Sequence, residues 1–238
     1  MKIASFIVGI MCVVSTFKAY SGCTPLASGA ISWWPGETNA FDIIDGNHGT
    51  LVGDTTYGTG VVGNCFVFDG NRDGVNIGVA TNLQITNITV EAWIQRFSDT
   101  DPSFNGNHNG HIFSLGTGGG GWAFYVKSNG KLAFGKLQVS EVTSDAEVTD
   151  TYWHHVAVTI TGSTVSFFVD GVEYTTAGYS PGTYSYAANG YIGAWLYSGI
   201  VDNSFYGGID ELTIYNRALT VCEIQAIYCA KTAGKCVP

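Results

Sequence analysis

The carboxylates of this chain are few and scattered, which limits the chemistry that they can perform together. Two carboxyl groups that flank one glycosidic bond can hydrolyse it, and Glu-x-Asp-x-x-Glu on one strand is a known arrangement of such a pair. That spacing does not occur. The adjacent Asp210 and Glu211 would point to opposite faces of a regular strand, and Glu91 has no acidic neighbour on its segment. We therefore expect a protein without catalytic activity. A hydrolase that draws its carboxylates from different strands is the less favoured alternative.

The histidines do not indicate an enzyme either. His154 and His155 are adjacent in an expected strand and would face opposite sides, so they cannot bind one metal together. His108 and His111 flank an Asn/Gly-rich loop in which no third zinc ligand is evident. No Gly-x-Ser-x-Gly turn suggests a nucleophilic serine. We expect His155 to be a packed residue of a sheet.

Aromatic residues crowd residues 179–206, together with many glycines and almost no charge. Flat rings pack against the C–H faces of sugars, and nearby Asn and Asp side chains bind the hydroxyls. The residues predicted to form such a glycan-binding platform are Tyr184, Tyr186, Trp195 and Tyr197. Two other interpretations stay open, namely packing of these loops onto the body of the protein and contact with a protein partner.

Alternating apolar residues predict the strands that must position these groups. Every second residue is apolar in residues 88–94, 156–160 and 165–169. Asn129-Gly130 and Asp170-Gly171 are strong two-residue hairpin signals. Many short strands with turn residues between them predict an all-β fold, a two-sheet antiparallel sandwich.

A short helix is expected near the C-terminus. Thr220 and Glu223 have the spacing of a capping box, in which both side chains bind backbone groups of the first turn. Ile224, Ile227 and Tyr228 follow as an apolar stripe that would dock the helix on the sandwich.

Length and charge narrow the class of protein further. The chain has 238 residues and a formal net charge of −9. All-β domains of this size are common, so residues 22–238 are predicted to form one domain. The acidic balance argues against a nucleic-acid partner, because phosphate binding requires a basic face. It suits neutral glycans or a cation.

The N-terminus has the pattern of an export signal. Lys2 precedes a short apolar run, and Ala19-Tyr20-Ser21 offers small residues at the cleavage positions, which predicts a signal peptide over residues 1–21. The run is too short for a membrane span. We expect a secreted or cell-surface protein. A lipid anchor at Cys23 is the alternative, since Ser21 and Gly22 precede this cysteine as in a lipobox.

Export favours disulfides, and five cysteines follow the predicted cleavage site. Cys23 and Cys236 lie at the two ends of the domain, where a bridge would close the sandwich. Cys222 and Cys229 are seven residues apart on the expected helix, about 10 Å along its axis, and are too distant to pair. One of them is expected to pair with Cys65, and Cys229 is favoured.

Six segments carry a family resemblance when they are read in order. They are Ile31-Ser32-Trp33-Trp34-Pro35-Gly36, Phe66-Val67-Phe68-Asp69-Gly70, Thr89-Val90-Glu91-Ala92-Trp93, Trp153-His154-His155-Val156-Ala157-Val158-Thr159, Phe168-Val169-Asp170-Gly171 and Gly208-Ile209-Asp210-Glu211-Leu212. Together they resemble the laminin-G-like, concanavalin-A-like lectin jelly rolls across residues 30–230. The resemblance implies a jelly-roll sandwich and a carbohydrate-binding or adhesion module. A structural or protein-interaction subunit of an extracellular assembly is the alternative.

The resemblance also implies a structural cation, because members of this family commonly hold one. Calcium takes six to eight oxygen ligands from carboxylates and loop carbonyls. Asp42, Asp45 and Asn47 lie in a loop between expected strands, and Asp210 lies near the other end of the chain. We expect Asp42 and Asp210 to share a calcium ion. Asx turns in a polar loop would explain the first three residues equally well.

Overall fold

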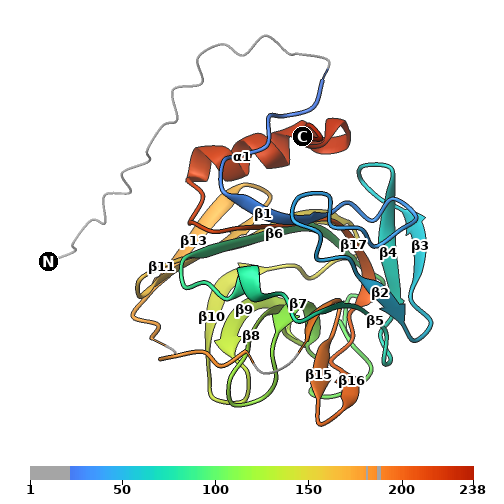
Figure 1. Ribbon diagram of the computed structural model, residues 1–238, viewed down its shortest axis with the longest axis vertical. Helices are drawn as coiled ribbons and strands as arrows, with labels where there is room; N and C mark the ends of the chain where they lie inside the picture. The colour runs from blue at the N-terminus through green and yellow to red at the C-terminus, as the bar shows by residue number, and fades with distance from the viewer. Residues whose placement is uncertain (1–21, 181, 187–188) are drawn as a thin grey trace, which may run out of the picture.

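The computed structural model describes residues 22–180, 182–186 and 189–238, and over these residues the chain forms two large antiparallel sheets that face each other (Figure 1). The predicted signal segment, residues 1–21, lies outside the described residues.

The first sheet has the spatial order β13, β12, β11, β6, β17, β4, β3, and β1 also pairs with β17. Its strands are β1 (Ala30–Trp34), β3 (Thr56–Thr59), β4 (Asn64–Asp69), β6 (Ile88–Arg96), β11 (Trp153–Thr161), β12 (Thr164–Val169), β13 (Val172–Ala177) and β17 (Tyr206–Tyr215).

The second sheet has the order β10, β9, β8, β7, β14, β5, β2. Its strands are β2 (Thr50–Val52), β5 (Gly74–Gly78), β7 (Gly110–Leu115), β8 (Trp122–Val126), β9 (Lys131–Lys136), β10 (Ser140–Glu147) and β14 (Gly190–Ile192). A hairpin of β15 (Trp195–Tyr197) and β16 (Ile200–Asp202) pairs separately. The predicted two-sheet sandwich is confirmed.

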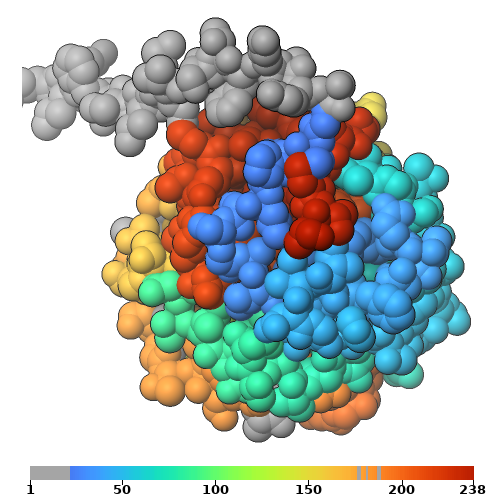
Figure 2. All heavy atoms as spheres, turned by 45° about the horizontal axis from the view of Figure 1, so that its top comes forward, coloured from blue at the N-terminus to red at the C-terminus, as the bar shows by residue number. Residues whose placement is uncertain are grey.

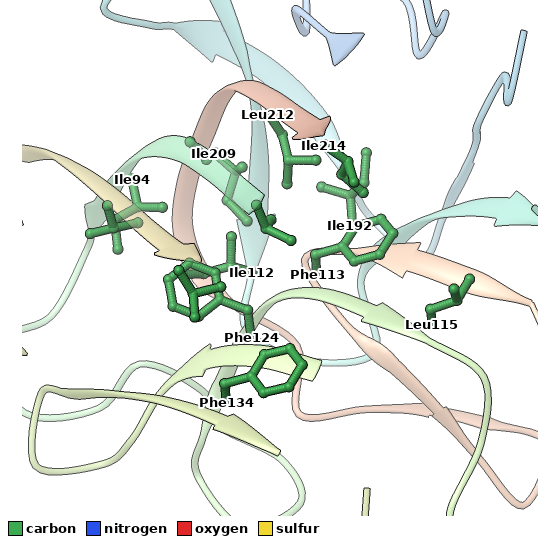
Figure 3. Close-up of a cluster of buried hydrophobic side chains, with 14 of the residues drawn as sticks. Ile94, Ile112, Phe113, Leu115, Phe124, Phe134, Ile192, Ile209, Leu212 and Ile214 are labelled. Atoms are coloured by element: carbon green, nitrogen blue, oxygen red, sulfur yellow. The ribbon is translucent and has the colours of Figure 1, made fainter. Parts of the chain in front are cut away.

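The core fills the space between the sheets, because alternate residues of each strand point inward. Ile94, Ile209 and Ile214 from the first sheet meet Ile112, Phe124 and Phe134 from the second (Figure 3). The alternation predicted for residues 88–94 is confirmed, since all four of its apolar residues are buried in this cluster. Both predicted hairpins are also present, with Gly130 and Gly171 at positive φ in the turns.

Helix α1 (Val221–Ala230) begins with the predicted capping box, in which the Thr220 hydroxyl accepts from the Glu223 N–H and the Glu223 carboxylate accepts from the Thr220 N–H. Its residues Ile224 and Ile227 are buried against Phe168 and Tyr215, on the outer face of the first sheet. Two short 3₁₀ turns, Thr81–Leu83 and Lys231–Ala233, complete the helical segments. Within the described part of the chain, none of the helical segments has the length and apolar character needed to cross a bilayer.

The two ends of the domain lie side by side, as Figure 2 shows for the N-terminal segment in blue and the C-terminal residues in dark red. The predicted Cys23–Cys236 disulfide joins them. Backbone hydrogen bonds between Thr24 and both Gly234 and Cys236 flank the disulfide. Because the Cys23 sulfur is part of this bond, it is not available to a lipid in this form of the protein.

The predicted Cys65–Cys229 disulfide is wrong, because both residues are free thiols. Cys65 is buried on β4, and its Sγ–H donates to the Thr59 carbonyl on the neighbouring strand. Cys229 is exposed on α1. Burial raises the pKa of the Cys65 thiol to about 12, so this thiol is protonated and unreactive at neutral pH.

Replacing Cys23 and Cys236 with serine should destabilise the protein, because the disulfide closes a loop of 213 residues. Loop-closure entropy sets an upper limit of about 5 kcal/mol on the loss in free energy of unfolding. Urea denaturation of the double variant measures it. Cys229→Ser, which changes an exposed free thiol, is the matched control and should stay within about 0.5 kcal/mol of the native protein. Equal stability of all three proteins would contradict the prediction.

Candidate functional site

Small side chains hollow the outer face of the second sheet. On β8 and β9 the large residues Trp122, Phe124 and Phe134 point into the core, whereas Ala123 and Ala133 point outward. Glycine follows at position 135, so this part of the outer face carries little side-chain volume. The alternation that builds the core therefore also leaves a depression on the opposite face.

The β15–β16 hairpin lies at the lower end of the second sheet in Figure 1. Its Trp195 closes one side of the depression. Trp195 of the hairpin is buried against Ala123, Tyr125, Ala133 and Leu137. The result is a groove of about 290 Å³. Its lining residues are Asn107, Asn109, His111, Tyr125, Gly135, Lys136, Leu137, Gln138, Val139, Ser140, Glu141, Trp195 and Asn203.

Four aromatic rings form a row beside the groove. The Tyr125 and His111 rings are 5.0 Å apart and nearly parallel, at 18°. The His111 and Trp195 rings follow at 5.9 Å and 11°, and the Trp195 and Tyr197 rings at 5.0 Å and 31°. Tyr197 ends the row and is 40% exposed, so it is the ring that a ligand reaches most easily.

The floor of the groove is uncharged but retains unsatisfied polar atoms. Burial lowers the pKa of His111 to about 3, so its ring is neutral at physiological pH. The buried His111 Nδ1 and Trp195 Nε1 atoms have no hydrogen-bond partner in the protein. Buried polar groups without a partner are rare and suggest that a ligand or water completes them.

One carboxylate, Glu141, belongs to the groove wall. The Tyr125 hydroxyl and the Lys127 ammonium both donate hydrogen bonds to it. Partial burial alone would raise the pKa of Glu141, but these two hydrogen bonds outweigh it and lower the pKa below its ordinary value. Glu141 is therefore a charged acceptor at neutral pH.

The structure divides the four predicted ligand-binding residues into two pairs. Trp195 lines the groove, and Tyr197 stacks on it at the end of the ring row, outside the lining. Tyr184 and Tyr186 lie outside the groove lining and are half-buried against the core, with their rings 5.9 Å apart. For this second pair, the packing interpretation describes the observed contacts.

Sequence reasoning missed Tyr125, His111 and Glu141 as groove residues. The alternation of residues 122–126 does place Tyr125 on the outer face, so this signal was present. His111 and Glu141 had no such signal, because they lie 30 residues apart and meet only through the pairing of β7, β8, β9 and β10.

Asp42, Asp45 and Asn47, three of the predicted calcium ligands, are bound to protein groups. Asp42 accepts from the backbone N–H of Trp33 at 2.9 Å through Oδ1 and from that of Asn47 at 3.0 Å through Oδ2. Asp45 accepts from the Asn82 amide at 2.8 Å. Asp42 Oδ1 also accepts from the Ile44 N–H at 3.0 Å, which is the Asx turn that the alternative interpretation expected, whereas the other contacts join more distant residues.

Asp210 belongs to a different network, and its carboxylate shares no hydrogen-bond donor with Asp42. Its Oδ2 accepts from the backbone N–H groups of Val61 and Val62, while its buried Oδ1 has no partner. Burial raises the pKa of Asp210 to about 8. The unpartnered oxygen suits a cation ligand. However, no group of three or more His, Cys, Asp or Glu residues could hold a metal in the described ranges. Calcium would depend on carbonyl oxygens here, and its binding stays a prediction.

A bulge brings Glu211 to an unexpected position. The pairing of β17 with β6 shifts between Asp210 and Thr213, and Ile209 and Leu212 both face the core. Asp210 and Glu211, between these two, therefore both lie away from the core. The prediction that they point to opposite faces was wrong, because it assumed a regular strand.

Glu211 joins a buried charged network on the outer face of the first sheet. Lys235 lies 3.0 Å from Glu91 and 3.2 Å from Glu211, and it is 5% exposed. His155 contacts the other Glu91 oxygen at 3.0 Å and is completely buried, which agrees with the packed residue expected. Although burial opposes charge on both partners, their attraction raises the pKa of Lys235 and lowers that of Glu91. The network attaches the C-terminal segment to the sheet.

Comparisons with known proteins agree with this architecture. The family model Laminin_G_3, described as the concanavalin A-like lectin/glucanases superfamily, matches residues 69–225, which is more than half of the chain. The chain therefore belongs to this family, and the predicted resemblance is confirmed. No curated protein is similar enough in sequence to match it.

Solved structures with the same fold include carbohydrate-active proteins. Domain 4 of AbnA, an extracellular arabinanase of Geobacillus stearothermophilus, in complex with arabinotriose has a TM-score of 0.64 at 19% identity, over 82% of this chain and 96% of that chain. The CBM40 of a Ruminococcus gnavus IT-sialidase has a TM-score of 0.53 at 16% identity, over 63% and 86%.

A mutant Trypanosoma rangeli sialidase with trans-sialidase activity gives a TM-score of 0.62 at 16% identity. The match covers 90% of this chain but 36% of the sialidase chain. At these identities the likeness establishes a shared fold.

Replacing Lys235 with methionine should leave Glu91 and Glu211 buried without their cation. Breaking such a pair from one side costs about 3–5 kcal/mol in free energy of unfolding. Urea denaturation measures the loss. Lys231→Met is the matched control, since the exposed Lys231 ammonium lies over the Tyr228 ring and contributes about 0.5–1 kcal/mol. If both variants lost the same small amount, the network would not stabilise the domain.

Calcium binding would stabilise the folded state, because an ion that binds only this state shifts the unfolding equilibrium. Saturating calcium should then raise the melting temperature by about 5 °C relative to chelator. Asp210→Asn should abolish the difference, and Asp45→Asn would show whether the first loop takes part. Identical melting curves in calcium and in chelator would rule out the site.

Proposed function

We propose that this protein is a secreted, non-catalytic module that binds carbohydrate in the groove on the outer face of the second sheet. The observation that carries the proposal is the row of four rings beside a groove whose lining includes the amides of Asn107, Asn109, Gln138 and Asn203. Aromatic faces bind the C–H surface of a sugar, and amides bind its hydroxyls.

The fold neighbours support this class of ligand. The arabinanase domain was solved in complex with arabinotriose, and the CBM40 was also solved bound to α2,3-sialyllactose. Export is supported by the Cys23–Cys236 disulfide, a bond that persists in oxidising compartments, together with the signal peptide predicted from the sequence.

The distribution of carboxylates supports binding without hydrolysis. Glycoside hydrolysis commonly requires two carboxyl groups on either side of one bond. Glu141 is the single carboxylate among the described residues that line the groove. Glu91 and Glu211 converge elsewhere, but Lys235 lies between them and all three are buried. A sugar could not reach either carboxylate without displacing the C-terminal segment.

A protein partner is the second candidate, and a surface cluster of aromatic residues favours it. Phe97 and Phe104 are 43% and 51% exposed, and both rings contact Tyr206, with centroids 5.7 Å and 4.5 Å away. Exposed aromatic clusters of this kind occur at protein interfaces. No binding across a broad glycan array would favour this candidate over the first.

Tyr197→Ala should weaken glycan binding about two- to tenfold, because it removes the accessible ring and stacking contacts contribute about 0.5–1.5 kcal/mol. An array screen followed by calorimetry on the strongest binder measures the change. Tyr152→Ala is the matched control, since Tyr152 is 74% exposed and is not one of the four rings of the row. The proposal fails if the two variants bind equally well.

A further inference from the structure

We propose that Glu141 is the hydroxyl acceptor of the groove, and that the groove takes uncharged sugars that present a hydroxyl group to its Oε2 atom. This inference rests on the proposed function, and it names the ligand class and the residue that selects it.

The position of Glu141 depends on a glycine. Glu141 on β10 pairs with Gly135 on β9, the residue that extends the floor of the groove. A Cβ atom at Gly135 would lie 2.6 Å from the Ser140 carbonyl oxygen and 2.9 Å from the Glu141 Cβ. Only glycine allows the two strands to approach this closely at that point, and the approach brings the carboxylate to the groove wall.

The carboxylate is oriented but not saturated. The Lys127 ammonium and the Thr143 hydroxyl both donate to Oε1, whereas Oε2 accepts from the Tyr125 hydroxyl. An ionised carboxylate accepts about four hydrogen bonds, two on each oxygen, so one site is left on Oε2. The Glu141 side chain is 42% exposed, so a ligand can reach this site. The open site on Oε2 matches one sugar hydroxyl.

The cations beside the groove already have partners. Lys127 donates to Glu141, and the Lys136 ammonium donates to the Thr183 carbonyl oxygen at 2.6 Å. No arginine belongs to the described lining of the groove, and arginine is the residue suited to bidentate binding of a carboxylate. A sialylated or uronic sugar would therefore bring a second negative charge towards Glu141 without an uncommitted cation to bind it.

Two rings that line the groove with Glu141 are uncharged. Burial raises the pKa of Tyr125 and lowers that of His111, so both rings stay uncharged across the physiological range. The Asn203 Oδ1 accepts from the Asn107 N–H at 2.9 Å, which fixes the orientation of one amide at the groove. Apart from Lys136, whose ammonium binds Thr183, the groove thus combines one charged acceptor with neutral polar groups, a set suited to hydroxyls.

The test compares Glu141→Gln with Glu147→Gln, a matched change at an exposed residue on the same strand and outside the groove lining. Both variants and the native protein are screened on an array that carries neutral oligosaccharides, including arabinotriose and lactose, beside α2,3-sialyllactose. We expect the strongest ligands to be neutral, with binding reduced at least tenfold in Glu141→Gln and unchanged in Glu147→Gln. Removing the hydroxyls of the best ligand one at a time should identify one hydroxyl whose loss abolishes the difference between the native protein and Glu141→Gln.

The pH profile gives an independent readout. The lowered pKa of Glu141 means that the charged acceptor is present above that pKa, so native binding should fall only as the pH drops through it. His111 on β7, Tyr125 and Lys127 on the β8 side, and Lys136 on β9 are the other ionisable groups at this wall, and burial lowers the pKa of His111 to about 3. Glu141→Gln should lack the loss of binding that the native protein shows as Glu141 becomes protonated.

The outcomes separate the two proposals. Binding that depends on Tyr197 but not on Glu141, or a preference for sialylated over neutral glycans, overturns this inference and leaves the proposed function standing. If no glycan on the array binds, or if Tyr197→Ala leaves binding unchanged, both the proposed function and this inference are overturned.

Discussion

Each large sheet packs its apolar inner face against the other sheet. The chain segments that cover the outer face of each sheet therefore determine which outer face is open to a ligand. On the first sheet the outer face is covered by α1, through Ile224 and Ile227, and by the C-terminal segment around Lys235. On the second sheet Trp195 covers Ala123 and Ala133, and the groove lies beside this cover, over Gly135. In the proposed function, this asymmetry of the two outer faces separates stability from recognition.

The charged side chains are also distributed differently over the two outer faces. The covered face holds Glu91, Glu211, His155 and Lys235, where burial is tolerated because opposite charges are within about 3 Å of one another. The disulfide beside Lys235 keeps the C-terminal segment in place over this network. The open face holds a single carboxylate with neutral rings. A hydrolytic pair of acids is hence absent from the described lining of the groove, and the convergent pair is out of reach of a polymer.

The family and its structural neighbours share an architecture at low sequence identity, and fold alone does not specify a ligand. What distinguishes this chain is the set of side chains that its strands display outward. Tyr125, Glu141 and the Trp195–Tyr197 hairpin belong to different strands, and each would be unremarkable without the others. Ligand class in such a domain is therefore a property of the outer face, while stability is a property of the inner one.

The sequence by itself determined the elements whose cause is local. Alternation in residues 88–94, the turns at Asn129-Gly130 and Asp170-Gly171, and the capping box at Thr220 depend on neighbours within a few positions, so they could be predicted. Pairing of Cys23 with Cys236 followed from their places at the two ends of the domain. The remaining contacts were decided by the tertiary structure, because strand order and a bulge determine which distant residues come together. The bulge at Asp210 turned Glu211 towards Lys235. The position of β4 left Cys65 without Cys229 as a disulfide partner. The pairing of β7 to β10 brought His111, Tyr125 and Glu141 to one groove. No local sequence pattern predicts these contacts, since they depend on which strands become neighbours in the sheets.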